Sequence, residues 1–155
     1  MEAELHGAYL DDLTGAFRRT LGMVALGHEV DRARRADGRL VCAFVDVDHL
    51  KVINDRDGHA AGDRVLRTLV EVMRRTLRSF DPIVRYGGDE FVCALGGADI
   101  ADVTRRLEAI DRALKLESGT GISIGLASLA GEETLEEVMV RADTALLEAK
   151  AARVA

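Results

Sequence analysis

The stretch Gly87-Gly88-Asp89-Glu90-Phe91 decides which fold and which chemistry we expect of this chain. β-type runs flank it on both sides, at positions 83–86 and 91–95. Two such runs joined by a glycine turn predict a β-hairpin that displays both carboxylates at its tip. Glycine lets a bulky ligand approach the backbone, and exposed N–H groups there suit phosphate. Because adjacent carboxylates suit a hard cation such as Mg²⁺, the stretch indicates a site for a metal-bound nucleotide.

Length and composition indicate one globular domain with a core of its own. The chain has 155 residues, of which 48% are hydrophobic and 31% charged, values typical of such domains. Its formal net charge of −6 argues against a nucleic-acid backbone as the main partner. The sequence has no recognisable signal peptide and no apolar run of membrane length. We therefore expect a cytoplasmic protein that contacts neither membrane nor nucleic acid.

Outward from the hairpin, the pattern of apolar residues predicts helices that alternate with a few strands. Residues 40–45 form a continuous apolar run, typical of a buried central strand. Residues 122–129 resemble another strand, in which Gly125 is a candidate for a close backbone approach. Helices are predicted at about residues 15–35, 50–55, 61–79, 100–114 and from 135 onward, the last two begun by Asp99 and by a Thr134–Glu137 capping box.

This order of elements predicts an α/β (α+β) layered sandwich around a mixed sheet. Residues 1–13 are expected to be a lead-in segment, and residues 14–155 the domain itself.

Acidic residues at the strand end and in the turn are candidates for metal binding. Asp46 and Asp48 follow the strand at residues 40–45 and share one face, since side chains alternate along a strand. On their own, such aspartates more often face solvent or cap the next helix. If that strand lies beside the hairpin, Asp46 meets Asp89 and the two can share a cation. The Gly-Gly-Asp-Glu turn favours this metal site over the solvent-facing alternative. Glu90 points away from Asp89 and is either a second ligand or a base; the alternative is a tip that is polar only for solubility.

A polar series runs from the strand end into the following helix: Lys51, Asn54, Asp55, His59 and Asp63. A carboxylate can accept hydrogen bonds from N1–H and the 2-amino group of guanine, and an amide can donate to its O6. Asp63 and Asn54 are therefore candidate guanine readers. Favourable charge at a helix N-terminus explains Asp63 equally well, and His59 is more often a structural loop residue than a base.

Together these motifs resemble the GGDEF family of diguanylate cyclase domains. The resemblance covers nearly the whole chain, in the family's order and spacing, and includes Arg85-Tyr86 before the glycine turn. Its further motifs are Asp-Leu-Thr-Gly at 12–15, Asp-Val-Asp at 46–48, Lys51, Ile-Asn-Asp at 53–55, Gly58-His59, Gly62-Asp63, Ile-Ser-Ile-Gly at 122–125 and Arg-Ala-Asp at 141–143. The chain departs from the family at His49-Leu50, where aromatic residues are usual. It also lacks the C-terminal Gly-Arg-Asn, and Arg153 stands one position from the family's phosphate-binding arginine.

The resemblance implies a nucleotide-cyclase-like three-layer sandwich, with a central mixed sheet of five strands flanked by helices. It also implies two Mg²⁺ or Mn²⁺ ions in each active site, held by Asp46, the Val47 carbonyl and Asp89. Glu90 matches a signature acid assigned to metal binding or catalysis. The residues implied in substrate binding are Asn54 and Asp63 for guanine, Lys51 and Lys150 for phosphates, and Gly87, Gly88 and His59 beside the nucleotide.

The implied reaction joins two GTP molecules into cyclic di-GMP and releases pyrophosphate. Each subunit of a homodimer presents one GTP, whose 3′-hydroxyl attacks the α-phosphorus of the other. Family members usually carry a sensory or regulatory domain, which we expect outside this chain.

Arg78 and Asp81 match the family's product-inhibition site for cyclic di-GMP, since a guanidinium can pair with phosphate or guanine. An arginine at a helix C-terminus, with Asp81 opening a turn before Pro82, explains the same residues without a ligand. Two alternatives to the cyclase are a non-catalytic module that binds GTP or cyclic di-GMP and an enzyme that makes a mixed guanine–adenine product. The intact signature argues against the first, and Asp63 against the second, because adenine lacks an N1–H.

Overall fold

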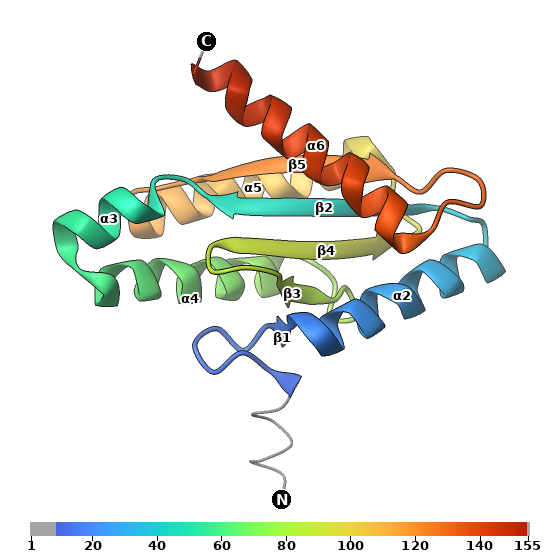
Figure 1. Cartoon of the computed structure of the whole chain (residues 1–155), viewed down its shortest axis with the longest axis horizontal. Helices are drawn as coiled ribbons and strands as arrows, with labels where there is room; N and C mark the ends of the chain where they lie inside the picture. The colour runs from blue at the N-terminus through green and yellow to red at the C-terminus, as the bar shows by residue number, and fades with distance from the viewer. Residues whose placement is uncertain (1–8, 155) are drawn as a thin grey trace, which may run out of the picture.

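The protein is built around a mixed five-stranded sheet with the strand order β1-β3-β4-β2-β5 (Figure 1). The computed structural model describes residues 9–154, with side chains described up to residue 153. β1 runs parallel to β3, and the other neighbouring strands are antiparallel. The expected mixed sheet is therefore confirmed. The strands are β1 (Phe17–Arg18), β2 (Leu40–Val47), β3 (Ile83–Arg85), β4 (Glu90–Gly96) and β5 (Ile122–Ser128).

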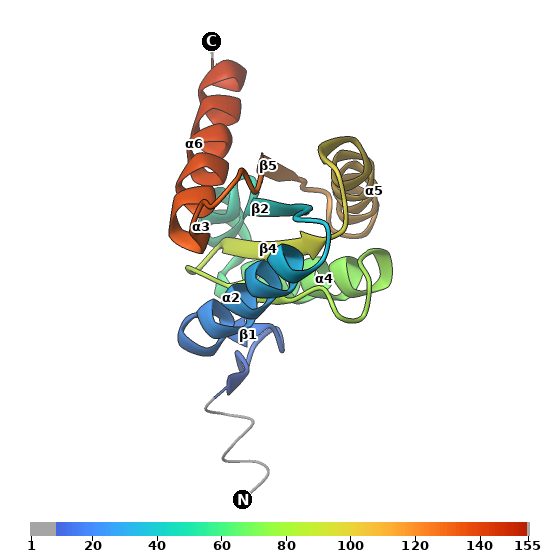
Figure 2. The same cartoon turned by 90° about the vertical axis from the view of Figure 1, so that its right-hand side faces the viewer.

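Helices cover both faces of the sheet and complete three layers, as expected. Figure 2 shows α2 and α6 on one face and α4 and α5 on the other. Successive side chains of each strand enter two separate cores: Val45 packs with residues of α4 and α5, and Phe44 with residues of α2 and α6. None of the described helices is both long and apolar enough to cross a bilayer. The helices are α2 (Arg19–Arg35), α3 (Leu50–Asp57), α4 (His59–Thr76), α5 (Ile100–Ser118) and α6 (Leu135–Val154).

β2 is the central strand and is buried along its whole length. Its register places Asp46 opposite Glu90 of β4 on one side and opposite Ser123 of β5 on the other. A continuous apolar run suits a strand that is covered on both faces. The buried strand expected at residues 40–45 is confirmed and extends two residues further, which brings Asp46 into the ladder.

The segment before α2 differs from the prediction of one helix from about residue 15. α2 begins at Arg19, and the two residues before it form β1 beside β3. The cause is a local turn: Gly15 has a φ of +77°, and the Asp11 carboxylate accepts the N–H and the hydroxyl of Thr14 at 2.9 and 2.8 Å. This turn delivers the chain in extended form to the sheet edge. Residues 1–8 of the expected lead-in lie outside the described residues.

α4 is displaced from its predicted span of 61–79. It begins directly after Gly58, whose φ of +89° breaks the chain direction, and ends at Thr76, because Leu77 is extended. The predicted C-terminal end is therefore wrong. As a consequence, Arg78 lies on the loop between α4 and β3 instead of at the end of a helix, and Asp81 lies on the same loop, outside the helix as expected.

α6 packs against β5 because Gly125 has no side chain. A Cβ at this position would overlap the carbonyl oxygen of Ala142 and lie 2.7 Å from the Cα of Leu146. The predicted close approach at Gly125 is confirmed. The predicted capping box is also present, since the Thr134 and Glu137 side chains each accept the other's backbone N–H at 3.2 Å. From this start α6 runs over the sheet toward the end of β2 (Figure 1).

Gly125→Ala is expected to lower the free energy of unfolding by about 1–3 kcal/mol or more, because the new methyl group meets backbone atoms of α6. The matched control is Gly27→Ala within α2, where a Cβ meets no atom within 4 Å. That change should raise the free energy of unfolding by about 0.5–1 kcal/mol, since alanine favours a helix over glycine. Urea unfolding measures both, and equal effects would contradict the role of the close approach.

Candidate active site

The signature turn joins β3 to β4 and is held against the end of β2. The N–H groups of Tyr86 and Gly87 both donate to the Glu90 carbonyl, at 2.8 and 3.2 Å, and so close the turn. The Val47 N–H donates to the Asp89 carbonyl at 3.2 Å. The predicted hairpin is therefore present, and its tip lies beside the last residue of β2.

A cavity of about 530 Å³ opens at this end of the sheet. The strand end, the signature turn, α3 and α6 all contribute to it, so it forms only when distant parts of the chain come together. Its carboxylate, ammonium and guanidinium groups suit a cation together with an anionic ligand. Of the predicted site residues it brings together Asp46, Val47, Lys51, Asp89 and Lys150, and Asp48, His49, Leu50, Ser123 and Arg153 complete its lining.

Asp46 is buried, with only 5% of its surface exposed. Its Oδ2 forms an ion pair with the Lys150 ammonium, whereas its Oδ1 is buried without a hydrogen-bond partner. An unpartnered buried oxygen is costly unless a ligand satisfies it. Partial burial also lowers the pKa of Lys150. No three His, Cys, Asp or Glu side chains among the described residues form a metal-binding group, so a cation here would draw further ligands from the backbone, water or a bound phosphate.

Asp48 and Arg153 are held together by Ser123. The Ser123 hydroxyl donates to Asp48 Oδ1 at 2.6 Å. The Arg153 guanidinium donates to Asp48 Oδ2 at 3.0 Å and to Ser123 Oγ at 2.9 Å. Although its spacing differs from the family's arginine, Arg153 reaches the same cavity as Lys150. The role of Ser123 was not predicted. The sequence feature that could have revealed it is a polar residue between two isoleucines, Ile122 and Ile124, in a predicted strand.

Glu90 lies in a second, smaller cavity of about 250 Å³, which Tyr86 and Asp143 also line. Asp89 lines the larger cavity, so the two signature carboxylates are separated, as the alternation of side chains predicts. Burial raises the pKa of Glu90, and the negative charges of Asp143 and Asp89 raise it further, against the opposing charge of Arg19. The structure thus separates Glu90 from the cavity of the other expected ligands, and its role as a metal ligand stays a prediction.

The candidate guanine readers lie on α3 and α4, and neither of them lines the cavity that contains Asp46 and Asp89. Asn54 of α3 packs against Gly62 of α4, where a Cβ would collide with the Asn54 side chain. The Oδ1 atom of Asn54 is buried without a hydrogen-bond partner. Asp63 is half-buried next to Gly62, whereas His59 is exposed at the start of α4. Both residues are therefore neighbours of Gly62: Asn54 contacts it from α3, and Asp63 follows it in the sequence of α4.

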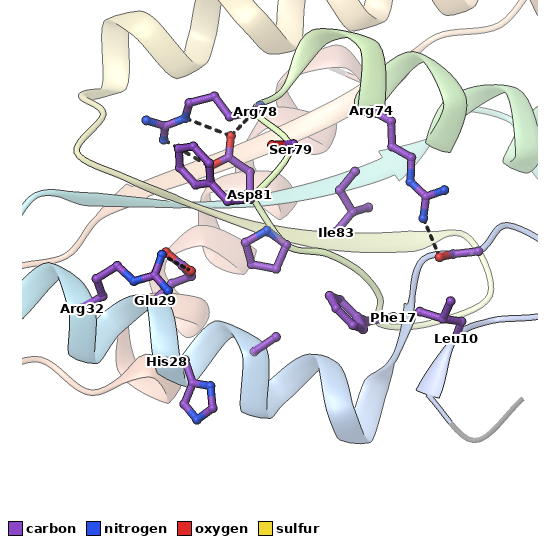
Figure 3. A pocket seen from close by; sticks show the side chains of 14 residues that line it. Leu10, Phe17, His28, Glu29, Arg32, Arg74, Arg78, Ser79, Asp81 and Ile83 are labelled. Atoms are coloured by element: carbon purple, nitrogen blue, oxygen red, sulfur yellow. Dashed lines mark hydrogen bonds and ion pairs between the residues drawn. The ribbon is translucent and has the colours of Figure 1, made fainter. Parts of the chain in front are cut away.

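Arg78 and Asp81 contact each other beside another cavity, of about 610 Å³, which α2 also lines (Figure 3). Oδ2 of the buried Asp81 accepts hydrogen bonds from the Arg78 N–H at 2.9 Å and from its Nε at 3.2 Å. The Arg78 guanidinium also donates to the Gly96 carbonyl at 2.6 Å and lies 4.7 Å from the Phe80 ring. Asp81 Oδ1 lies 3.1 Å from the Arg78 guanidinium but is buried without a hydrogen-bond partner. The two residues therefore pair within the chain and also border a space that a ligand can enter.

The chain belongs to the GGDEF family, because the family model described as "Diguanylate cyclase, GGDEF domain" matches residues 8–154. It is 38% identical over 160 residues to the diguanylate cyclase DgcP of Pseudomonas aeruginosa, an alignment that covers 98% of this chain. It is 34% identical over 158 residues, or 96% of the chain, to the diguanylate cyclase DosC of Escherichia coli K12. The chain spans 24% and 34% of the lengths of these two relatives.

Solved structures of the family have the same fold. A microbial GGDEF domain described in its interaction with cyclic di-GMP superposes with a TM-score of 0.87 at 37% identity, and 94% of each chain is covered. The diguanylate cyclase SiaD of Pseudomonas aeruginosa, in complex with its activator SiaC, superposes with a TM-score of 0.86 at 32% identity. That match covers 97% of this chain and 61% of SiaD. The expected GGDEF-type sandwich is thereby confirmed.

Proposed function

We propose that this domain is a diguanylate cyclase, which condenses two GTP molecules into cyclic di-GMP and releases two pyrophosphates. The observation that carries the proposal is the cavity at the end of β2, where Asp46, Asp89 and Lys150 meet in a chain of the GGDEF family. Two carboxylates and an ammonium in one cavity suit a triphosphate with its metal. The activity named for DgcP and DosC supports the assignment.

Asp46, the Val47 carbonyl and Asp89 are proposed to hold two Mg²⁺ or Mn²⁺ ions. These residues fit such ions because Asp46 Oδ1 is buried without a partner, and hard cations prefer carboxylate and carbonyl oxygens. When bound there, such ions would activate the 3′-hydroxyl and neutralise charge on the phosphoryl oxygens. Lys150, as the ion-pair partner of Asp46, stands where it can bind a phosphate. For Glu90 we propose one of two roles, either as a further metal ligand or as a group that takes part in catalysis.

The nucleotide is proposed to lie with its guanine toward α3 and α4 and its phosphates toward the signature turn. Asp63 accepts from N1–H and the 2-amino group, and the Asn54 amide donates to O6. Lys51 and Lys150 bind the phosphates, and the backbone at residues 87–88 passes beside them.

A homodimer is proposed because one site presents one GTP, while the cyclic product needs two bonds between two nucleotides. Regulation from outside this chain is proposed as well. The chain spans about a quarter of DgcP, and SiaD is seen with an activator protein.

Asp89→Ala is expected to lower kcat by about a thousandfold, because loss of a metal ligand removes several kcal/mol of transition-state stabilisation. The purified domain is incubated with GTP and Mg²⁺, and its products are resolved by mass spectrometry. The matched control is Asp31→Ala, which removes an exposed carboxylate of α2 and should leave the rate unchanged. Full activity of Asp89→Ala would refute the metal assignment.

The same assay separates the competing functions. If the unsubstituted domain gives no product even at high protein concentration, a non-catalytic binding module is favoured. A mixed dinucleotide from GTP plus ATP would instead favour the altered substrate.

Asp63→Ala is expected to reduce the preference for GTP over inosine triphosphate by about tenfold or more. Inosine triphosphate lacks the 2-amino group, and a hydrogen bond to a charged acceptor contributes about 1.5–3 kcal/mol. The ratio of kcat/KM for the two nucleotides is measured for this variant and for Asp55→Ala, which removes a neighbouring exposed carboxylate of α3. An unchanged ratio in Asp63→Ala would mean that another residue reads this edge of guanine.

Arg78→Ala is expected to raise the cyclic di-GMP concentration that halves the initial rate by more than about tenfold, because a charge-assisted contact to the product is lost. Arg75→Ala is the control, since Arg75 pairs with Glu117 on the surface instead. Added product is titrated against the initial rate of each variant. If cyclic di-GMP inhibits Arg78→Ala and Arg75→Ala equally, the Arg78–Asp81 pair has only a structural role.

A further inference from the structure

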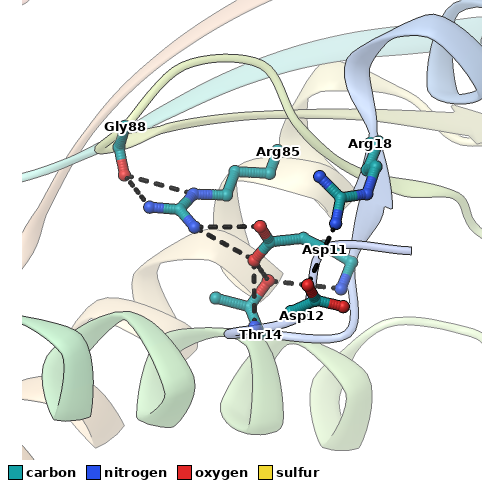
Figure 4. A network of polar contacts seen from close by, with 7 residues as sticks. Asp11, Asp12, Thr14, Arg18, Arg85 and Gly88 are labelled. Carbon is teal, nitrogen blue, oxygen red and sulfur yellow. Dashed lines mark hydrogen bonds and ion pairs between the residues drawn. The ribbon is translucent and has the colours of Figure 1, made fainter. Parts of the chain in front are cut away.

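Arg85 connects the turn at the start of the domain to the signature turn (Figure 4). Its Nη1 atom donates to both oxygens of the Asp11 carboxylate, at 3.0 Å each. Its Nε and Nη2 atoms donate to the Gly88 carbonyl, at 3.3 and 2.8 Å. Asp11 also accepts the N–H and the hydroxyl of Thr14. Asp11, Thr14, Arg85 and the Gly88 carbonyl form one network, the turn anchor.

The turn anchor is better shielded from water than a surface ion pair. The side chains of Arg85 and Asp11 are 20% and 15% exposed, whereas those of the neighbouring pair Arg18–Asp12 are 43% and 85% exposed. A guanidinium bound on both of its edges is also held in one orientation. Burial acts to raise the pKa of Asp11, but the hydrogen bonds from Thr14 and the charge of Arg85 outweigh it and lower that pKa.

The signature turn has little packing of its own at Gly88. Gly88 is exposed, and a Cβ built there meets no atom within 4 Å. The backbone hydrogen bonds that close the turn go to the Glu90 carbonyl, and the bond from the Val47 N–H of β2 goes to the Asp89 carbonyl. Arg85 supplies the contact to the Gly88 carbonyl, which belongs to the peptide just before Asp89. Because the peptide is planar and carries the Cα of Asp89, its orientation affects where the Asp89 carboxylate points.

We infer that Asp11 and Arg85 are positioning residues, which orient the Gly88–Asp89 peptide and through it the Asp89 carboxylate. The kinetic part of the inference rests on the proposed cyclase function. Displacing a catalytic group by about 1 Å costs about a hundredfold in rate. Because neither Asp11 nor Arg85 lines the cavity of Asp46 and Lys150, the turn anchor acts on kcat more than on the KM for GTP.

Asp11→Asn and Arg85→Lys test the inference. The first keeps the shape of the side chain without its charge, and the second keeps the charge without the two-sided guanidinium. Each should lower kcat by about ten- to a hundredfold while the KM for GTP changes by less than about threefold. The double variant should be no slower than the single ones, since all three break the same connection. Asp12→Asn is the control, because this exposed carboxylate of the same turn pairs with Arg18 and should tolerate the change.

A second readout needs no activity. The ¹⁵N order parameters of the Gly88 and Asp89 amides should be about 0.85 in the unsubstituted domain and in Asp12→Asn, and below about 0.6 in Asp11→Asn. Rigid amides in Asp11→Asn, unchanged kcat in both anchor variants, or an equal loss in Asp12→Asn would overturn the inference. So would a loss of kcat that only follows a loss of folded protein, as measured by circular dichroism. Loosened amides in a domain that makes no product would refute the cyclase proposal and retain the turn anchor.

Discussion

The antiparallel pairing of β2 with β4 positions every other part of the site. The ladder ends with Asp46 opposite Glu90 and continues into the hydrogen bond between the Val47 N–H and the Asp89 carbonyl. A slip of one residue would turn every side chain of β2 to the other face. Val45 would then leave its core, and Asp46 would enter the packed layer between the sheet and α4 and α5. The same register that fills both cores therefore places a strand-end carboxylate beside the signature turn.

The second requirement is that α6 crosses the sheet closely enough to bring cations to that carboxylate. Contact at Gly125 sets its path, and Lys150 and Arg153 then reach Asp46 and Asp48 at the far end. In a chain with a net charge of −6, this crossing produces a local group of positive charges beside two acids. Opposite charges gathered in one cavity are what a metal-bound polyphosphate needs, because each of its parts finds a partner.

Local signals predict much of this architecture, whereas contacts between distant segments account for what the sequence does not reveal. The glycine turn and the Thr134 cap are short motifs with their own geometry, and both are present. A two-residue strand such as β1 carries no periodicity, so it follows only from pairing with β3. Asp11 lies in a segment that was expected to be only a lead-in. Its ion pair with Arg85 leaves no mark on the local sequence pattern, because an aspartate is common in turns with or without such a partner. The meeting of Asp46 and Asp89 was expected on the condition that their strands are neighbours, and the two residues do line one cavity. The ion pair of Asp46 with Lys150 depends instead on the exact path of a helix that begins far along the chain.

Asp46 and Asp89 are proposed to hold divalent cations beside a triphosphate. A crystal structure of the domain with Mn²⁺ and a non-reactive GTP analogue would test this assignment, because anomalous scattering locates the metal. We expect anomalous peaks within bonding distance of both carboxylates and the Val47 carbonyl, with the phosphates in the same cavity. Peaks elsewhere on the protein, with Asp46 still paired only to Lys150, would contradict it.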